Sequence, residues 1–277
     1  MNNLQEKKDK KTADAFASSW NNLPYGSVYT WDQFVDWLAP IKEKDIKGKN
    51  VLELGCGNAS LMAHILNWQP AKIIGIDLGD SILSAKQNLE MSKYKNWEIK
   101  QADLVEYKSE GYDFVYSIGV LHHLKSPKKG FDSVIRNTKS KGSFHCWVYA
   151  REGNNMIVFF VDPIRKFASK LPWWVTKYFL ATPLVFPYYL YAKFLRLFKK
   201  LSFLKFLPLY DYSLWIAKRN FLFFRHVAFD QLVTPQTTYI PRKTIEEWLK
   251  SNKNINQNST YIVMRNGNSW KFGGKVK

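Results

Sequence analysis

The chain carries a short glycine-containing loop directly after an apolar run. Residues 51–54 read Val-Leu-Glu-Leu, and Gly55 and Gly57 follow with one residue between them. This pattern predicts a buried strand that turns into a helix, because glycine permits the tight turn and leaves no side chain in the way of a ligand. The loop therefore predicts an α/β fold with a ligand site at the carboxyl end of this strand.

A second apolar run, at 73–76, ends in Asp77, twenty residues after Gly57. A carboxylate at the end of such a strand can accept hydrogen bonds from ribose hydroxyls, so the two motifs together predict a nucleoside-type ligand. A dinucleotide-binding loop has a third glycine three residues after the second, which brings a helix N-terminus onto the pyrophosphate. Ser60 occupies that position, which argues against a dinucleotide.

Two further acids lie near the expected ligand. Glu53 stands two residues before Gly55, and Asp103 follows a predicted strand at 96–100. An acid beside the loop favours a ligand that carries an ammonium group and no phosphate, and Asp103 could accept from an adenine amino group. The spacing by itself indicates a nucleoside-type site and does not name the ligand.

Apolar, strand-like runs alternate with helical patterns up to about residue 150, which is typical of a parallel sheet covered on both faces. The predicted strands lie near 50–54, 72–77, 96–100, 112–118 and 142–149, and the predicted helices near 58–67, 80–92, 127–138 and 242–251. Ligands of such sheets bind beyond the carboxyl ends of the strands, where all these motifs fall.

The ordered motifs resemble those of the class I S-adenosylmethionine-dependent methyltransferases, and within them the small-molecule (type 11/12-like) branch that includes quinone-biosynthesis enzymes. The matching segments are 53–57, Asp77, 102–103 and 117–124, and the tail at 265–270 is similar to the closing hairpin of some members. The resemblance covers about residues 48–150. It implies a Rossmann-like, seven-stranded mixed sheet with helices on both faces, S-adenosylmethionine as methyl donor and S-adenosylhomocysteine as product.

The same resemblance and motifs give a candidate cosubstrate site. Its expected members are Glu53, Gly55, Cys56, Gly57, Asn58, Asp77, Leu78, Asp103, Leu104, Ser117, Ile118 and Gly119. No metal site is predicted, because the chain has two cysteines, Cys56 and Cys146, and neither a disulfide framework nor a metal-ligand spacing.

His122 and His123 follow the fourth predicted strand, beside the expected methyl group. Methyl transfer from a sulfonium is mostly a matter of alignment and exclusion of water, and a base is then needed to remove a proton from the nucleophile. Histidine titrates in the useful range, so both residues are catalytic candidates. The alternative is that one or both are structural, and we expect His122 to face the site and His123 to hold the loop.

The chain divides into four expected parts. Residues 1–47 form an N-terminal lid or helical segment, in which Trp20 and Tyr25 either touch the ligand or pack on the sheet. Residues 48–150 form the Rossmann-like core, 151–226 an aromatic and basic helical cap inserted into it, and 227–277 the last helix and closing hairpin.

The cap segment has a distinct composition. It contains thirteen Lys or Arg against three acids, a large share of the net charge of +18 for the whole chain. Its longest uncharged run, 178–192, is too short and proline-interrupted to span a membrane, which takes about 20 residues. A basic helix with aromatic residues at 188–206 could lie on an anionic membrane surface, or it could simply close the pocket.

The function expected from these features is methyl transfer to a hydrophobic or lipid-linked small molecule. The alternatives are an RNA methyltransferase that uses the basic surface and a non-catalytic, methyltransferase-like binding protein. No Asn/Asp-Pro-Pro-aromatic motif follows the fourth strand, which argues against nucleic acid as a partner. We expect no signal peptide and a cytoplasmic location, peripheral on the inner face of the membrane. The acceptor atom and the oligomeric state cannot be read from the sequence.

Overall fold

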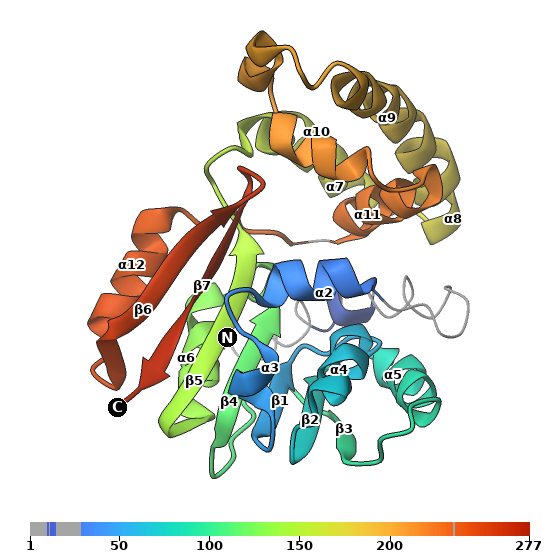
Figure 1. Cartoon of the computed structure of the whole chain (residues 1–277). Coiled ribbons are helices and arrows are strands. Elements are labelled where there is room, and N and C mark those ends of the chain that lie inside the picture. Colours follow the sequence, from blue (N-terminus) through green and yellow to red (C-terminus); the bar gives the residue numbers. More distant parts are fainter. Residues whose placement is uncertain (1–9, 11, 15–28, 235) are drawn as a thin grey trace.

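The computed structural model describes residues 10, 12–14, 29–234 and 236–277. A seven-stranded sheet forms its centre, in the order β3-β2-β1-β4-β5-β7-β6 (Figure 1). The strands are β1 (Asn50–Leu54), β2 (Lys72–Asp77), β3 (Trp97–Gln101), β4 (Tyr112–Ile118), β5 (Thr138–Tyr149), β6 (Ile255–Arg265) and β7 (Ser269–Val276). Strands β1 to β5 are parallel, and β7 runs antiparallel to both of its neighbours. The expected α/β fold with a mixed, seven-stranded sheet is confirmed.

Helices cover the sheet on both faces because the strand side chains alternate between two apolar clusters. On one face, Val51 of β1 packs with α2 (Trp31–Leu38), α4 (Ser60–Ile65) and α5 (Ser81–Glu90). On the other face, Leu52 and Leu54 pack with α6 (Pro127–Arg136) and α12 (Arg242–Ser251). The short helix α3 (Glu43–Ile46) joins the first cluster through Ile46.

The order of the strands creates a natural place for a ligand. The chain moves outward from β1 to β2 and β3, and then returns to the other side of β1 with β4 and β5. The loops after β1 and β4 therefore leave in opposite directions and open a crevice at the carboxyl ends of the strands. The glycine loop and the two histidines lie at this switch point.

Most predicted elements lie where the sequence placed them, with local differences. Strand β5 begins at Thr138, four residues before the predicted start. The predicted helix 58–67 is divided into α4 and a 3-10 helix, η1 (Leu66–Trp68), and Ala59 before it has a φ of 59°. The closing hairpin is present as β6 and β7.

A helical cap lies beyond the carboxyl end of β5 (Figure 1). It contains the π-helical segments η3 (Ile157–Val161) and η4 (Thr176–Ala181), the 3-10 helix η5 (Ser202–Phe206), and the helices α7 (Asp162–Ala168), α8 (Trp173–Val175), α9 (Thr182–Leu197), α10 (Tyr210–Ile216) and α11 (Phe221–Val233). Helix α11 continues seven residues past the expected cap boundary at 226. The cap thus returns to the core at about residue 234.

The single helix expected over 188–206 is wrong. Helix α9 ends at Leu197 because Phe198 leaves the helical region, with φ −101° and ψ 19°. The chain then turns through η5 back to α10. Lys193 and Arg196 both donate hydrogen bonds to the carbonyl of Ala217, the C-cap of α10, at 2.9 and 2.8 Å. Two of the basic residues of α9 therefore stabilise a neighbouring helix end.

Within the described residues, no helix is both long enough and apolar enough to cross a membrane.

Candidate functional site

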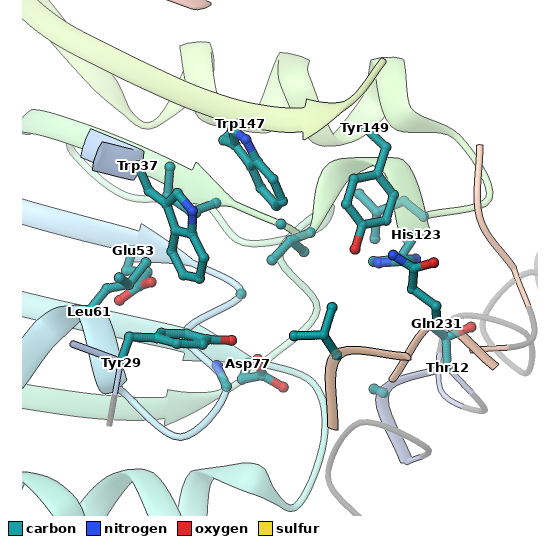
Figure 2. Close-up of a pocket in the computed structure, with 18 of the residues that line it drawn as sticks. Thr12, Tyr29, Trp37, Glu53, Leu61, Asp77, His123, Trp147, Tyr149 and Gln231 are labelled. Carbon is teal, nitrogen blue, oxygen red and sulfur yellow. Dashed lines mark hydrogen bonds between the residues drawn. The ribbon is translucent and has the colours of Figure 1, made fainter. Parts of the chain in front are cut away.

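A cavity of about 260 Å³ lies at the carboxyl ends of the parallel strands, under the cap. The sheet contributes the loops after β1, β2, β3 and β4 and the end of β5, and the cap contributes side chains from α10 and α11. In Figure 2, Trp37, Trp147 and Tyr149 point toward the space that Glu53 and Asp77 also face. The wall is acidic at the β1 and β2 loops and aromatic toward the cap.

The glycine loop after β1 has the backbone that the sequence predicts. Gly55 has a φ of 83°, and a Cβ atom there would lie 2.4 Å from Cγ2 of Val120. Gly57 has a φ of 53°, and its N–H donates to Oδ2 of Asp77 at 2.8 Å. Because this N–H is used inside the protein, the loop does not offer it to a phosphate. The geometry agrees with a ligand that carries no phosphate.

Asp77 joins the first two loops of the site. Its Oδ1 accepts from the N–H of Gly79 at 3.0 Å and from the hydroxyl of Ser81 at 3.1 Å. Burial raises the pKa of Asp77, and the hydrogen bonds from Gly79 and Gly57 act in the opposite direction. The carboxylate is therefore held in one orientation while it borders the cavity.

Glu53 is almost fully buried, with 2% of its surface exposed, and it accepts a hydrogen bond from the hydroxyl of Tyr116 at 2.7 Å. Burial raises the pKa of Glu53 strongly, and the nearby charge of Asp77 adds to this effect. Holding these acids close together without a cation is unfavourable. A bound cation would relieve that repulsion.

The described residues that line the cavity include three acids, Glu53, Asp77 and Asp103, and a single Lys or Arg, Arg265. This is the reverse of the whole chain, which has a net charge of +18. A cavity with this charge fits a cosubstrate that carries a sulfonium and an ammonium group, so the residues present fit S-adenosylmethionine.

The structure brings ten of the twelve expected cosubstrate residues to the cavity wall. They are Glu53, Gly55, Gly57, Asn58, Asp77, Leu78, Asp103, Leu104, Ile118 and Gly119. The side chains of the other two point elsewhere. Cys56 packs into the apolar cluster beneath α4, and Ser117 donates its hydroxyl to the carbonyl of Leu54 at 2.8 Å. Contact of the ten with the cosubstrate stays a prediction.

His123 lies on the cavity wall, on the 3-10 turn η2 (Leu121–His123) that follows β4. Its Nδ1 is 3.0 Å from the carbonyl oxygen of Gln236 and 3.1 Å from the hydroxyl of Thr237. Since a carbonyl can only accept, Nδ1 carries the proton and Nε2 does not. Burial lowers the pKa of His123 to about 3, so the ring is neutral near pH 7.

His122 is fully buried and does not line the cavity. Its ring lies 4.1 Å from the ring of Tyr149, and neither ring nitrogen has a hydrogen-bond partner among the residues that the structure describes. Burial lowers its pKa well below the usual value. The expectation that His122 faces the site is therefore wrong, because the turn directs His123 toward the cavity. The expectation that His123 holds a loop agrees with its contacts to Gln236 and Thr237.

The aromatic part of the wall was not predicted from the sequence. Trp147 and Tyr149 alternate along β5 and so share one face of the strand, a period-two signal that was available. Trp37 comes from α2, and Tyr212 and Trp215 come from α10 in the cap. No local pattern links these elements, since only the tertiary fold brings them together.

Arg265, at the end of β6, was also missed as a cavity residue. Its Nε donates to Oδ2 of Asp36 at 2.7 Å, and its Nη2 donates to the same oxygen. The guanidinium lies 5.2 Å from the ring of Trp215 and 5.9 Å from that of Trp147. It therefore connects the closing hairpin, α2 and the cap at the cavity.

Of the N-terminal segment, Thr12 and Ala13 border the cavity. Trp20 and Tyr25, which were expected either to touch the ligand or to pack on the sheet, lie outside the described residues. Within the described part, no cluster of His, Cys, Asp or Glu could hold a metal ion.

Comparison with known proteins assigns the first part of the chain to a family. Residues 45–155 match the family model described as "Methyltransferase domain". An O-methyltransferase family protein from Burkholderia thailandensis has a similar structure, with a TM-score of 0.52 and 11% identity over 89% of this chain and 56% of that one. The likeness shows the fold.

Curated relatives match over the same region. The chain is 28% identical over 119 residues to a tRNA U34 carboxymethyltransferase of Helicobacter pylori (strain P12), covering 40% of this chain and 45% of the relative. It is 35% identical over 103 residues to the protein of the same description from Azotobacter vinelandii (strain DJ / ATCC BAA-1303), covering 35% and 31%. The chain thus spans less than half the length of these relatives.

These relatives correct one expectation. The absence of the Pro-Pro-aromatic motif argued against nucleic acid as a partner, yet the relatives are described as acting on tRNA. The expectation that nucleic acid is not a partner is therefore wrong, because these relatives have tRNA in their descriptions. Residues 45–155 match a methyltransferase domain, and together with β6 and β7 they form the seven-stranded sheet expected of the class I, S-adenosylmethionine-dependent methyltransferases.

Proposed function

We propose that the chain is an enzyme that transfers a methyl group from S-adenosylmethionine to an acceptor held between the sheet and the cap. The observation that carries this proposal is the group of Glu53, Asp77 and Asp103 on the wall of one cavity in a strongly basic chain. A buried glutamate and two half-buried aspartates at this place favour a cationic cosubstrate, and S-adenosylmethionine supplies an electrophilic methyl carbon next to its sulfonium. The nucleophile forms a bond to that carbon, and the carbon–sulfur bond breaks with its electron pair on sulfur.

The acceptor of an oxygen or nitrogen methylation must also lose a proton. We assign this step to Nε2 of His123, the ring nitrogen that carries no proton when Nδ1 donates to Gln236. A pKa of about 3 disfavours a stable imidazolium. The ring therefore acts by accepting a hydrogen bond from the nucleophile and taking the proton as the methyl bond forms.

The aromatic part of the wall supports a hydrophobic small molecule as the acceptor, as in the small-molecule branch of the class. Trp147, Tyr149, Tyr212 and Trp215 offer ring faces and edges, and Arg265 provides a cation among them. Flat or unsaturated acceptors pack well on such rings, and a polar head group could pair with the guanidinium. A lipid-linked acceptor would place the enzyme at a membrane surface.

A second candidate acceptor is an RNA base. Its support is the description of the curated relatives as tRNA U34 carboxymethyltransferases, together with the net charge of +18. A base turned out of its strand can stack on aromatic side chains, and the basic exterior could hold the phosphates.

The cosubstrate is tested by calorimetric titration of S-adenosylmethionine and S-adenosylhomocysteine into the wild type, Asp77→Ala and Asp132→Ala. Asp132 is a matched control because it is an exposed acid that pairs with Lys128 on α6, away from the cavity. We expect binding in the wild type and the control and a loss of binding in Asp77→Ala. Equal binding in all three proteins would contradict the proposed site.

The acceptor is then tested with labelled S-adenosylmethionine offered to a lipid extract and, in parallel, to total tRNA. Transfer of label to one fraction identifies the acceptor class. His123→Asn keeps a donor for the carbonyl of Gln236 and removes Nε2, so we expect kcat to fall by about 10²-fold or more with cosubstrate affinity unchanged. An unchanged kcat would remove His123 from the mechanism.

A further inference from the structure

The outer face of helix α9 carries an apolar stripe. Phe186, Leu190, Phe194 and Leu197 follow one another at intervals of four, four and three residues, which places them on one side of the helix. Between 51% and 75% of the surface of each side chain is exposed.

The opposite side of α9 is also apolar, and it is buried. Val185 and Ala192 belong to a small cluster with Ile216 of α10 and Phe224 of α11, and Leu195 is fully buried. An apolar helix face is normally covered by other parts of the protein or by a partner. The outer stripe of α9 has no such cover from the part of the chain that the structure describes, so it has the composition of a contact face.

Exposed apolar side chains also lie on other elements of the cap. Phe159 and Phe160 lie on η3, Phe167 on α7, and Phe203 and Phe206 on η5, and all five are more than half exposed. Of the 24 large apolar side chains that are exposed in the described residues, 18 lie between Met156 and Leu222. The apolar surface is therefore a property of the cap, since a soluble surface usually scatters such residues singly.

The charge of the same region is predominantly positive. Residues 163–210 contain no Asp or Glu and nine Lys or Arg. Lys193 and Arg196 are held at the end of α10, and Arg165 pairs with Asp162. Several of the others are exposed, including Lys199, Lys200 and Lys205, which lie just past the stripe. The partner of this face is therefore expected to be apolar and negatively charged.

We propose that the outer face of the cap, formed by the α9 stripe, η5 and the exposed lysines, docks on the interface of an anionic lipid bilayer. A bilayer provides both features at once, because its acyl boundary accepts phenylalanine and leucine side chains while its phosphates attract lysine. An RNA backbone would match the lysines and leave the stripe in water. A second copy of the chain would bring like charges together. Docking is independent of the proposed methyl transfer, because it is measured without turnover.

The test is co-sedimentation of the full chain with vesicles of phosphatidylcholine alone and of phosphatidylcholine mixed with phosphatidylglycerol. The apolar variant is Leu190→Ser/Phe194→Ser/Leu197→Ser, and its matched control on α5 and its C-cap is Leu83→Ser/Met91→Ser, two equally exposed apolar positions. The charge variant is Lys199→Glu/Lys200→Glu/Lys205→Glu, and its matched control is Lys243→Glu/Lys250→Glu/Lys253→Glu on and after α12.

The wild type and both controls should bind the mixed vesicles and bind the neutral ones much more weakly. The charge variant should bind the mixed vesicles about 100-fold more weakly, since each lysine near an anionic surface contributes about 1 kcal/mol. The apolar variant should lose at least about tenfold. All four variants change exposed side chains, and unaltered thermal unfolding and S-adenosylhomocysteine binding establish that they fold.

Several results would overturn the proposal. One is the apolar variant binding as well as the wild type, and another is equal binding to neutral and anionic vesicles. A third is a wild type that does not bind vesicles and forms a dimer in light scattering, while the apolar variant is a monomer. The fourth is binding of tRNA that is lost in the charge variant while vesicles are never bound.

Discussion

Replacing His122 with leucine tests whether this residue is buried, neutral and unpartnered. Leucine fills a similar volume beside Tyr149 and has no polar atoms. A buried polar atom without a hydrogen bond is unfavourable by about 1–3 kcal/mol, and both ring nitrogens of His122 are in this state. We therefore expect His122→Leu to raise the free energy of unfolding at pH 7 by about 1–3 kcal/mol, measured by urea titration.

The pH dependence of the unfolding free energy provides a second, independent test of the state of His122. Burial lowers the pKa of His122 in the folded chain, whereas the unfolded chain titrates near 6.5. The unfolded state therefore binds more protons below pH 6.5, and stability falls as the pH falls through this value. Between pH 7 and pH 5 the loss from one such histidine is about 2 kcal/mol. His122→Leu should remove that part of the acid sensitivity.

His145 provides the contrasting variant. Its pKa is lowered to about 4 by burial, but its ring nitrogens lie 2.8 Å from the carbonyl of Trp37 and 2.7 Å from the hydroxyl of Tyr261. His145→Leu should also reduce the acid sensitivity, yet it should lower the stability at pH 7 because both partners lose their hydrogen bond. If His122→Leu behaves like His145→Leu, or if its unfolding free energy keeps the acid dependence of the wild type, the reasoning about His122 is refuted.

Two further predictions concern the loops of the cavity. Gly55→Ala should lower the unfolding free energy by at least about 2 kcal/mol, because the residue needs a φ of 83° and a Cβ would meet Val120. Adding Val120→Ala to this variant should restore only the part of the stability that the clash removes. Full restoration of the unfolding free energy would contradict the argument from backbone strain. Tyr116→Phe should weaken S-adenosylhomocysteine binding because Glu53 loses its hydroxyl donor. Ser117→Ala should lower the stability by about 1 kcal/mol and leave S-adenosylhomocysteine binding unchanged. Equal binding of the two variants in calorimetry would refute the role of Tyr116 in supporting Glu53.

The sequence predicted the core of the fold well because its signals are local. The glycine loop, Asp77 and the apolar runs each lie within one strand and its following turn, and these motifs together with the family resemblance named ten residues that line the cavity. The orientation of His122 and His123 was not predictable in this way. The two residues are adjacent on one short turn, and the contacts that orient them come from Gln236 and Tyr149, which are distant in sequence.

The cap shows the opposite case. Its composition indicated a basic, aromatic insertion, but its helix boundaries and contacts depend on packing between segments of similar composition. The helical spacing of apolar and basic residues in 188–206 continues past Leu197. The turn at Phe198 that ends α9 contains no glycine or proline, so the sequence has no local signal for it. The sequence placed Lys193 and Arg196 in a basic helix for a membrane surface or for closing the pocket, whereas the fold directs both to the carbonyl of Ala217.

Opposite charges are separated between the inside and the outside of this chain, and salt should act on them differently. Added salt reduces the Debye length from about 10 Å at 0.1 M to about 3 Å at 1 M, and it screens exposed charges far more than buried ones. Glu53 is buried, while Lys199, Lys200 and Lys205 are exposed. We therefore expect salt to weaken vesicle binding steeply and to leave S-adenosylhomocysteine binding nearly constant. The Lys199→Glu/Lys200→Glu/Lys205→Glu variant should lose most of the salt response of vesicle binding. A parallel decline of both affinities in the wild type would mean that the acids of the cavity are as open to solvent as the lysines of the cap, and the argument from buried charge to a cationic cosubstrate would then fail.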